Sequence, residues 1–323
     1  MPELPEVHTT ATQLKNEVLG KTITAVWSDF HIRAVPKKGQ LKDPDFYTEF
    51  AAAVTGATVT GVDRRGKNIL LHLNPSTGSE QTTGTTVLIH LKLTGHLLVG
   101  SYQKNERPDQ ADLPENWREE PWIPIAEKSS PLWDPYNRFI HLIFCFNDGT
   151  HLALSDMRRF AKVLLLGTDG LARSKELTSL GPDPRTLSPL EFQEHIHSKR
   201  SGRIKTVLLD QSVIAGVGNI YSDEALFAAR IHPETDVTAL TDEQLTDLRT
   251  ALKAVIDRAI ETGGDSDGDY RDLYGRTGTF QNFHHVYRKT GSPCPRTGCS
   301  DTIERIVVGG RSAHFCPLCQ TPA

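Results

Sequence analysis

The hydrophobic pattern changes character near residue 187, and this change limits the folds that the chain can adopt. Before it, short strand-like runs separated by turn residues recur at 22–27, 58–63, 68–73, 86–91, 139–146, 151–155 and 161–166. After it, the spacing of apolar residues becomes helical at 189–199, 203–210, 219–229 and 241–262. Repeated short strands favour a β-sandwich or barrel, and helical periodicity favours amphipathic helices. The sequence therefore predicts an α+β protein with more than one domain.

Two stretches interrupt these patterns. The polar stretch at about 101–135 is interpreted as a long loop insertion, and the stretch from Gly167 to about Thr186 as a linker. A length of 323 residues suits about two domains. No apolar run reaches the roughly 18 residues of a membrane span, and residues 1–7 do not resemble a signal peptide. We therefore expect no membrane span and a cytoplasmic location.

Four of the five cysteines cluster near the C-terminus, as Cys294-x4-Cys299 and Cys316-x2-Cys319. Two close pairs separated by a loop fit a tetrahedral four-thiolate zinc site. Two disulfides are the alternative, which a reducing compartment disfavours. Because four thiolates fill every position around the metal, we expect one structural Zn²⁺ and no zinc-dependent hydrolase. The remaining cysteine, Cys145, lies in an apolar run and is interpreted as a small buried hydrophobic residue.

The extreme N-terminus could carry out covalent chemistry. Removal of Met1 would leave Pro2 with a free secondary amine, and an α-amine with a pKa of about 7.7–8.0 is partly unprotonated at neutral pH. Such an amine can form a Schiff base with a carbonyl carbon. The neighbouring Glu3 and Glu6 could give or take protons. The alternative is a frayed terminus with two solvated acids.

Four further motifs could contact nucleic acid, and each also has a purely structural interpretation. They are a basic turn at 64–67, a histidine-containing segment at 90–95, an Arg- and Phe-containing segment at 156–160, and a glycine-rich segment at 216–224. An Arg beside an apolar wedge suits invasion of a base stack. Glycines before a helix leave backbone N–H groups open to phosphate oxygens. The structural interpretations are a solvated loop, a core histidine, a strand end and a helix joint.

Together, these features resemble the formamidopyrimidine-DNA glycosylase (Fpg/MutM) family, which also includes endonuclease VIII. The resemblance covers nearly the whole chain, and four motifs in the family's order carry it. They are Pro2-Glu3-Leu4-Pro5-Glu6-Val7, Asp156-Met157-Arg158-Arg159-Phe160, Gly216-Val217-Gly218-Asn219-Ile220-Tyr221 and the terminal cysteines. The domains that the resemblance implies are an N-terminal catalytic β-sandwich with flanking helices over 1–167, a hinge over 168–187, a helix–two-turns–helix DNA-binding domain with a lesion-capping loop over 188–284, and a zinc finger over 285–323.

The resemblance implies base-excision repair by a bifunctional DNA glycosylase and AP lyase. Such enzymes remove oxidised purines, typically 8-oxoguanine and formamidopyrimidines, from double-stranded DNA and then cut the strand by β,δ-elimination. They also act on abasic sites, and a bacterial cytoplasmic monomer fits this role. By resemblance, Pro2 would attack the sugar C1′ to form the Schiff base, and Glu3 would act as general acid toward the deoxyribose ring oxygen. Glu6 would help to position the site, and Lys67 would contact the phosphate and the reacting centre.

DNA contacts also follow from the resemblance. The positions that hold phosphates or otherwise contact DNA are matched by His90, Lys205, Asn219 and Arg311. The positions that fill the hole left by a flipped-out base are matched by Leu93, Arg158 and Phe160. The family has a methionine where Leu93 stands, and leucine keeps an apolar wedge of similar volume. Arg158 would hydrogen-bond the orphaned cytosine, since arginine commonly pairs with base edges.

Some features separate this chain from the family's usual pattern. Leu4 favours the oxidised-purine branch, because endonuclease VIII relatives typically have glycine there. The segment 263–280 resembles the loop that caps the damaged base, but it is rich in aspartate. The first cysteine pair is more widely spaced than usual, and the insertion at 101–135 has no assigned role. An endonuclease VIII-like enzyme for oxidised pyrimidines and a non-catalytic damaged-DNA binding homologue stay open as alternatives.

The net charge of −4 does not argue against a DNA partner. Acidic residues outnumber basic ones in 101–135 and in 233–272, so the rest of the chain is positive overall. All the candidate phosphate contacts lie in that remainder. Local charge determines the field that a phosphate meets within a Debye length of about 8–10 Å. We therefore expect a basic DNA-binding surface, with weak non-specific binding that salt reduces strongly.

Overall fold

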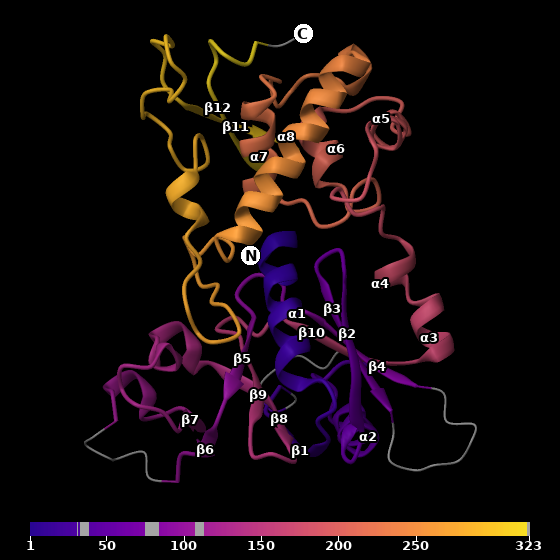
Figure 1. Ribbon diagram of the computed structural model, residues 1–323, viewed down its shortest axis with the longest axis vertical. Coiled ribbons are helices and arrows are strands. Elements are labelled where there is room, and N and C mark those ends of the chain that lie inside the picture. The colour runs from indigo at the N-terminus through magenta and orange to yellow at the C-terminus, as the bar shows by residue number, and fades with distance from the viewer. Residues whose placement is uncertain (31, 33–38, 75–83, 107–112, 322–323) are drawn as a thin grey trace. The chain divides into compact units, whose positions relative to one another are not determined.

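The computed structural model describes residues 1–30, 32, 39–74, 84–106 and 113–321 (Figure 1). The chain divides into two compact units. Unit 1 consists of Met1–Pro2, Glu6–Ser174 and Asp265–Gly278, and unit 2 consists of Glu3–Pro5, Lys175–Gly264 and Thr279–Ala323. Two short segments, Glu3–Pro5 and Asp265–Gly278, therefore belong to a different unit from the residues on either side of them in the sequence.

Unit 1 contains the predicted β-sandwich. Two four-stranded antiparallel sheets have the orders β10-β4-β3-β2 and β1-β8-β9-β5. Their strands are β1 (Ile23–Ser28), β2 (Thr58–Arg65), β3 (Asn68–Asn74), β4 (Thr85–His90), β5 (His96–Gly100), β8 (Ile140–Phe146), β9 (His151–Ser155) and β10 (Lys162–Gly167). Alternate strand residues such as Leu71, Val87 and Phe144 meet in one apolar core, as the period of two in a strand requires. Together with the helices of unit 2, this sandwich confirms the α+β fold.

Two helices pack against the same core. Helix α1 (Leu4–Val18) buries Val7 and Leu14, and helix α2 (Pro44–Val54) buries Phe50. The apolar patterns of the sequence did not indicate α2 or strand β5. The Asp43 side chain accepts a hydrogen bond from the backbone of Asp45. Such an N-cap, followed by Pro44, is the local signal that could have revealed α2.

The predicted loop insertion at 101–135 is irregular over most of its described residues, and the other described residues lie in short strands and 3₁₀ helices. They form β6 (Tyr102–Lys104), η1 (Glu115–Trp117), β7 (Trp122–Pro124) and η2 (Pro131–Trp133), and η3 (Pro135–Arg138) follows. Tyr102, Trp122 and Leu132 cover the outer face of the β1-β8-β9-β5 sheet. The rings of Trp117 and Trp133 meet edge to face at 5.1 Å. These large side chains are irregularly spaced, so the stretch lacks the periodicity that indicates regular structure.

Unit 2 is helical around its own core, as predicted. Its main helices are α5 (Pro189–His197), α6 (Ile204–Leu209), α7 (Asn219–Ala228) and α8 (Asp242–Glu261), and α7 and α8 lie side by side (Figure 1). Ser188 and Glu191 form a capping box at α5. Short helices α3 (Thr168–Arg173) and α4 (Lys175–Thr178) occupy part of the predicted linker.

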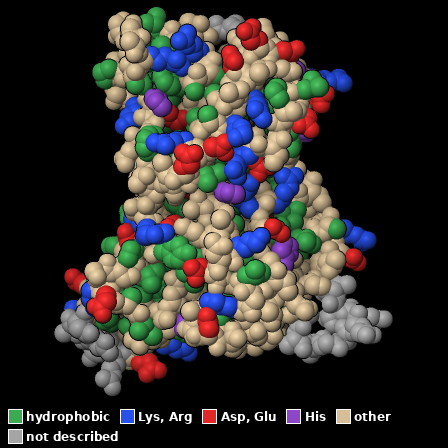
Figure 2. Space-filling model, in the orientation of Figure 1, with side chains coloured by type: hydrophobic (Ala, Val, Ile, Leu, Met, Phe, Trp, Pro, Cys, Tyr) green, Lys and Arg blue, Asp and Glu red, His purple; other side chains and the backbone are tan. Residues whose placement is uncertain are grey.

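A two-stranded hairpin, β11 (Glu304–Val308) and β12 (Arg311–Phe315), completes unit 2. Gly309 and Gly310 have φ angles of 57° and 76°, which suits a two-residue hairpin turn of type I′. Among the described helices, none combines the length and the apolar character that a membrane crossing requires. On the face drawn in Figure 2, basic and acidic side chains are intermixed.

Candidate functional site

The residues at the start of α1 pack against the start of α7. The Leu4 backbone N–H donates to the Gly216 carbonyl at 3.0 Å, and Glu3 Oε1 accepts from the Ile220 backbone N–H at 3.1 Å. Glu3 is only 2% exposed. A carboxyl oxygen that accepts a backbone N–H in the first turn of a helix is held there by that hydrogen bond. The fold therefore fixes Glu3 at a defined place on unit 2.

Two glycines make this close approach possible. A Cβ atom at Gly216 would lie 2.7 Å from Leu4 Cδ1, and one at Gly218 would overlap the carboxyl group of Glu3. The glycine-rich sequence predicts that N–H groups of this segment bind phosphate. The structure differs for Ile220, because its N–H already donates to Glu3. Glycines at these positions give a neighbouring chain segment room to approach.

Replacing Gly218 by alanine is expected to lower the stability of unit 2. The added methyl group must displace Glu3 or the start of α7, and such overpacking costs about 1–3 kcal/mol. Thermal unfolding measures the change. Gly170→Ala is the matched control, because its Cβ meets only Leu166 Cβ at 3.8 Å. Equal unfolding midpoints for Gly218→Ala and the wild type would contradict the expected clash.

Glu6 and Pro2 belong to unit 1 and are buried. Glu6 Oε1 accepts from the backbone N–H of Asp265 at 2.8 Å, so it holds the start of the aspartate-rich segment. Lys67 is 8% exposed and follows Gly66 in the turn between β2 and β3. In the described chain the Pro2 nitrogen is bonded to Met1, so a free amine there requires that Met1 be removed.

His90 ends strand β4 and presents a hydrogen-bond donor. Burial lowers the pKa of His90 to about 3, and the positive charges of Lys92 and Lys67 act in the same direction. His90 is therefore neutral at pH 7. Its Nδ1 accepts from the Lys92 backbone N–H at 3.0 Å, so the proton lies on Nε2. A neutral donor beside lysine side chains suits a phosphate oxygen.

The three predicted void-filling residues lie on two adjoining turns of unit 1. The Arg158 guanidinium lies 4.6 Å from the ring centre of Phe160, which is 44% exposed. The Thr94 side chain, next to Leu93, donates to buried Asp156, and the Arg158 backbone N–H donates to Thr94 Oγ1 at 3.2 Å. Both turns are therefore held together, with an apolar ring and a cation facing outward.

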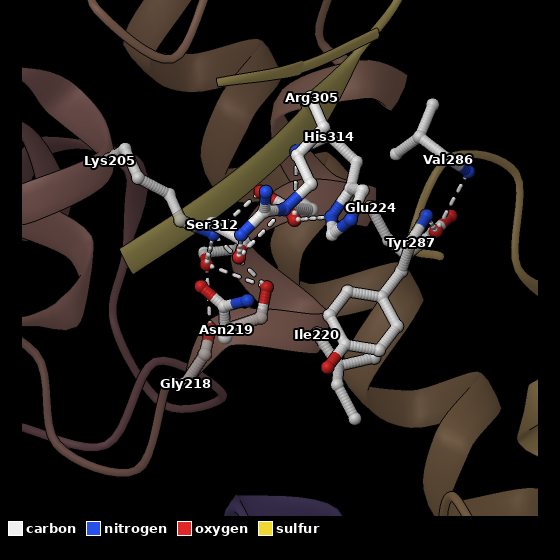
Figure 3. Close-up of polar contacts among 12 residues, drawn as sticks. Lys205, Gly218, Asn219, Ile220, Glu224, Val286, Tyr287, Arg305, Ser312 and His314 are labelled. Carbon is white, nitrogen blue, oxygen red and sulfur yellow. Dashed lines mark hydrogen bonds and ion pairs between the residues drawn. The ribbon is translucent and has the colours of Figure 1, made fainter. Parts of the chain in front are cut away.

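Lys205 differs from its predicted role as a surface contact. Its side chain is fully buried, and its Nζ donates to the Asn219 carbonyl at 3.1 Å and to Asp223 Oδ1 at 2.6 Å (Figure 3). Burial lowers the pKa of Lys205. Asp223 Oδ2 also accepts from the backbone N–H of His314 in β12 at 3.1 Å. The same oxygen lies 2.9 Å from His314 Nδ1, which donates to it in the tautomer that carries the proton on Nδ1. Lys205 therefore holds the start of α7 in place and does not reach a surface.

Asn219 and Arg311 keep polar groups available for a ligand. Asn219 Oδ1 is buried and has no hydrogen-bond partner among the described residues. Arg311 is exposed at the first position of β12. A Cβ at Gly309 would overlap Thr206 in α6, so the hairpin turn beside Arg311 packs tightly on that helix.

The sequence analysis assigned no role to the buried acids of α7, Asp223 and Glu224. Glu224 accepts from the backbone N–H groups of His285, Val286 and Tyr287 at 2.9, 3.0 and 2.8 Å (Figure 3). Together the two acids tie α7 to the segment before the cysteines and to β12. Helical spacing alone gives no sign of these contacts, because every partner is distant in the sequence.

The four terminal cysteines lie together in a cluster that could hold a metal ion, as predicted. Their sulfur atoms all lie within 4.8 Å of one another, with separations of 3.9 Å for Cys294–Cys319 and 3.6 Å for Cys299–Cys316. A tetrahedral site with Zn–S bonds of about 2.3 Å separates its sulfur atoms by about 3.8 Å. All four are free thiols. The donor set and spacing therefore fit zinc rather than disulfides.

Comparisons with known proteins cover the whole chain. Family models match the formamidopyrimidine-DNA glycosylase N-terminal domain at residues 1–163, the formamidopyrimidine-DNA glycosylase H2TH domain at 180–270, and the zinc finger found in FPG and IleRS at 291–322. The formamidopyrimidine-DNA glycosylase of Chloroflexus aurantiacus is 37% identical over 99% of this chain and 98% of its own. That of Pelotomaculum thermopropionicum is 35% identical over 99% of both.

Solved structures give the same result. The Lactococcus lactis Fpg bound to DNA with an abasic site has a TM-score of 0.75 and 28% identity, covering 99% of both chains. The wild-type Lactococcus lactis enzyme bound to DNA containing N7-benzyl-Fapy-dG has a TM-score of 0.74 and 29% identity, covering 99% of this chain and 100% of the other.

Proposed function

Because the chain belongs to the formamidopyrimidine-DNA glycosylase family, we propose that it excises oxidised purines and then cuts the DNA strand as an AP lyase. The observation that carries this proposal is the fixed position of Glu3. Its carboxyl group packs against Gly218 and accepts a hydrogen bond from the Ile220 backbone N–H. This position places a proton donor directly beside the proposed nucleophile in the chain, Pro2. The structures of Lactococcus lactis Fpg with DNA containing N7-benzyl-Fapy-dG or an abasic site support this substrate class.

The first step is displacement of the damaged base. The free amine of Pro2 attacks C1′, the bond between C1′ and the base breaks, and its electron pair leaves with the base. The base takes up the proton that the Pro2 nitrogen loses. Glu3 then protonates the ring oxygen as the C1′–O bond opens, leaving an iminium between Pro2 and C1′. Proton transfer by a positioned side chain contributes about 10²–10⁴-fold to such a step.

The second step is strand cleavage. The iminium makes a C2′ proton acidic, and its loss breaks the bond from C3′ to the phosphate oxygen. A second elimination releases the phosphate on C5′, so both flanking phosphates leave the sugar. Hydrolysis of the remaining Schiff base returns Pro2 to the free amine.

Holding the DNA is the task that we assign to residues of both units. Lys67, His90, Asn219 and Arg311 contact phosphates, and Leu93, Arg158 and Phe160 fill the space left by the flipped-out base. Glu6 positions the segment at Asp265, and Lys205 acts through the start of α7. One structural Zn²⁺ on the four cysteines holds the hairpin that carries Arg311. The protein acts as a monomer on double-stranded DNA in the bacterial cytoplasm.

Borohydride trapping tests the proposed chemistry. Reduction of the iminium should covalently link the protein to duplexes that contain 8-oxoguanine or an abasic site, and the link should be far weaker with dihydrouracil. Intact-mass measurement should show that Met1 is absent, because a retained Met1 blocks the Pro2 nitrogen. If none of the duplexes becomes covalently linked to the protein, the proposed enzyme activity is refuted and a damaged-DNA binding protein is favoured. Trapping only with the oxidised pyrimidine would favour an endonuclease VIII-like enzyme.

A further inference from the structure

The segment 265–278, called here the capping loop, is held by the η2–η3 segment that follows the insertion. Arg271 in the loop is 6% exposed, and its Nε lies 3.0 Å from Asp134 Oδ2. The Arg271 guanidinium also stacks on Tyr136, 4.8 Å from the ring centre. A buried cation needs a close opposite charge, so this pair fixes the middle of the loop.

Asn137 forms a second attachment close to the first. It is fully buried, and its Nδ2 donates to the Pro131 carbonyl at 2.9 Å and to the Gly275 carbonyl at 3.4 Å. Its Oδ1 lies 2.9 Å from His96 Nε2. Burial lowers the pKa of His96 to about 4, so this contact is to a neutral ring at pH 7.

Gly275 fits this contact because it has no side chain. Its φ angle is +81°, and a Cβ atom there would lie 2.6 Å from Asn137 Nδ2 and 2.9 Å from the Pro131 carbonyl oxygen. The loop therefore approaches the η2–η3 segment as closely as its backbone allows.

Further contacts hold the loop to the rest of unit 1. The Tyr270 hydroxyl donates to the Glu6 carbonyl at 3.3 Å. Leu273 is buried in the sandwich core, and its carbonyl accepts from the Val99 backbone N–H at 2.8 Å. The loop is thus ordered by contacts that are already present without DNA.

We propose that Asp134, Tyr136 and Asn137 position the capping loop over a flipped-out base, so that the insertion and the segment after it help to determine which damaged base is excised. This inference rests on the proposed function. A loop that is already ordered loses less conformational entropy when a base is bound. An abasic site has no base to cover, so its cleavage does not need the loop.

Asp134→Asn tests the proposal with little change of shape. Asparagine keeps an oxygen for the Tyr136 backbone N–H, which Asp134 Oδ1 accepts at 2.9 Å, and removes only the charge that faces Arg271. Gly275→Ala disturbs the second attachment, where the loop backbone contacts Asn137 and Pro131. Lys128→Ala is the matched control, because Lys128 is exposed in the insertion and its recorded ring contact is with Trp133, not with a loop residue.

Single-turnover excision of 8-oxoguanine and cleavage of an abasic duplex are measured for each protein. Both loop variants should lose about tenfold or more in excision, since small misplacements of a positioning group cost up to about a hundredfold. Abasic cleavage and both activities of Lys128→Ala should be unchanged. Equal losses on the two duplexes, or no loss on either, would overturn the proposal.

Hydrogen–deuterium exchange gives a readout that does not depend on catalysis. Amides of 265–278 should exchange faster in Asp134→Asn than in the wild type or in Lys128→Ala, whereas amides of α8 should not change. If the wild type cuts neither duplex, the proposed function fails, but exchange still tests the anchoring. Unchanged exchange in the loop would refute the anchoring itself.

Discussion

Excision of 8-oxoguanine is expected to fall about 10²–10⁴-fold when Glu3 is replaced by glutamine, the range attributable to one general acid. Glutamine keeps an oxygen that can accept from the Ile220 N–H, which Glu3 Oε1 now accepts at 3.1 Å. The substitution therefore removes the proton while leaving the packing at Gly218 in place. Single-turnover kinetics at saturating protein measures the chemical step directly.

Cleavage at an existing abasic site should be affected much less by the same change. An abasic sugar opens to an aldehyde in water, so Pro2 can form its Schiff base without a proton delivered to the ring oxygen. Glu49→Gln is the control, because Glu49 is an exposed glutamate on α2. Full excision activity in Glu3→Gln would refute the assigned role, and an equal loss on both substrates would instead indicate a disturbed site.

Loss of bound metal and of DNA affinity is expected for Cys316→Ser. Cys316 is fully buried in the cluster, and structural zinc contributes an apparent 10–16 kcal/mol or so to the folding of small zinc modules. Elemental analysis should give about one zinc per wild-type chain and much less in the variant. Binding to an abasic duplex should weaken, because the hairpin that carries Arg311 leads directly into Cys316.

The free cysteine outside the cluster provides the comparison. Cys145→Ser changes a partly buried thiol in β8 and should leave the zinc content and the DNA affinity as in the wild type. Chelation of the wild-type metal should reproduce the effect of Cys316→Ser. A Cys316→Ser protein that keeps its zinc and binds DNA normally would contradict the four-thiolate site.

Local patterns were sufficient for much of the architecture. The strands of the sandwich other than β5, and helices α5 to α8, follow from apolar spacing, because each element buries one face and so repeats its own period. The cysteine cluster follows from spacing alone, since four close thiols have few uses in a reducing compartment. Pro2 and Glu3 stood out because the chemistry of a terminal amine beside a carboxylate is a property of neighbouring residues.

The tertiary structure decided what depends on partners far apart in the sequence. In the folded chain, Lys205 is buried beside Asp223, Glu3 packs against Gly218, and Arg271 pairs with Asp134. None of these contacts produces a periodic pattern in the sequence, because a single ion pair or close approach involves only two residues. The stretch at 101–135 looked like a loop for the same reason, since scattered aromatic anchors hold it on the sheet.

The sequence by itself thus determined the fold class, the metal cluster and the candidate nucleophile and acid, all of which depend on local order. Whether a charged side chain faces solvent or the protein interior was settled only by the fold. Burial is decided by every element that packs around a residue, and charge in the interior is stable only where a partner lies within hydrogen-bond distance.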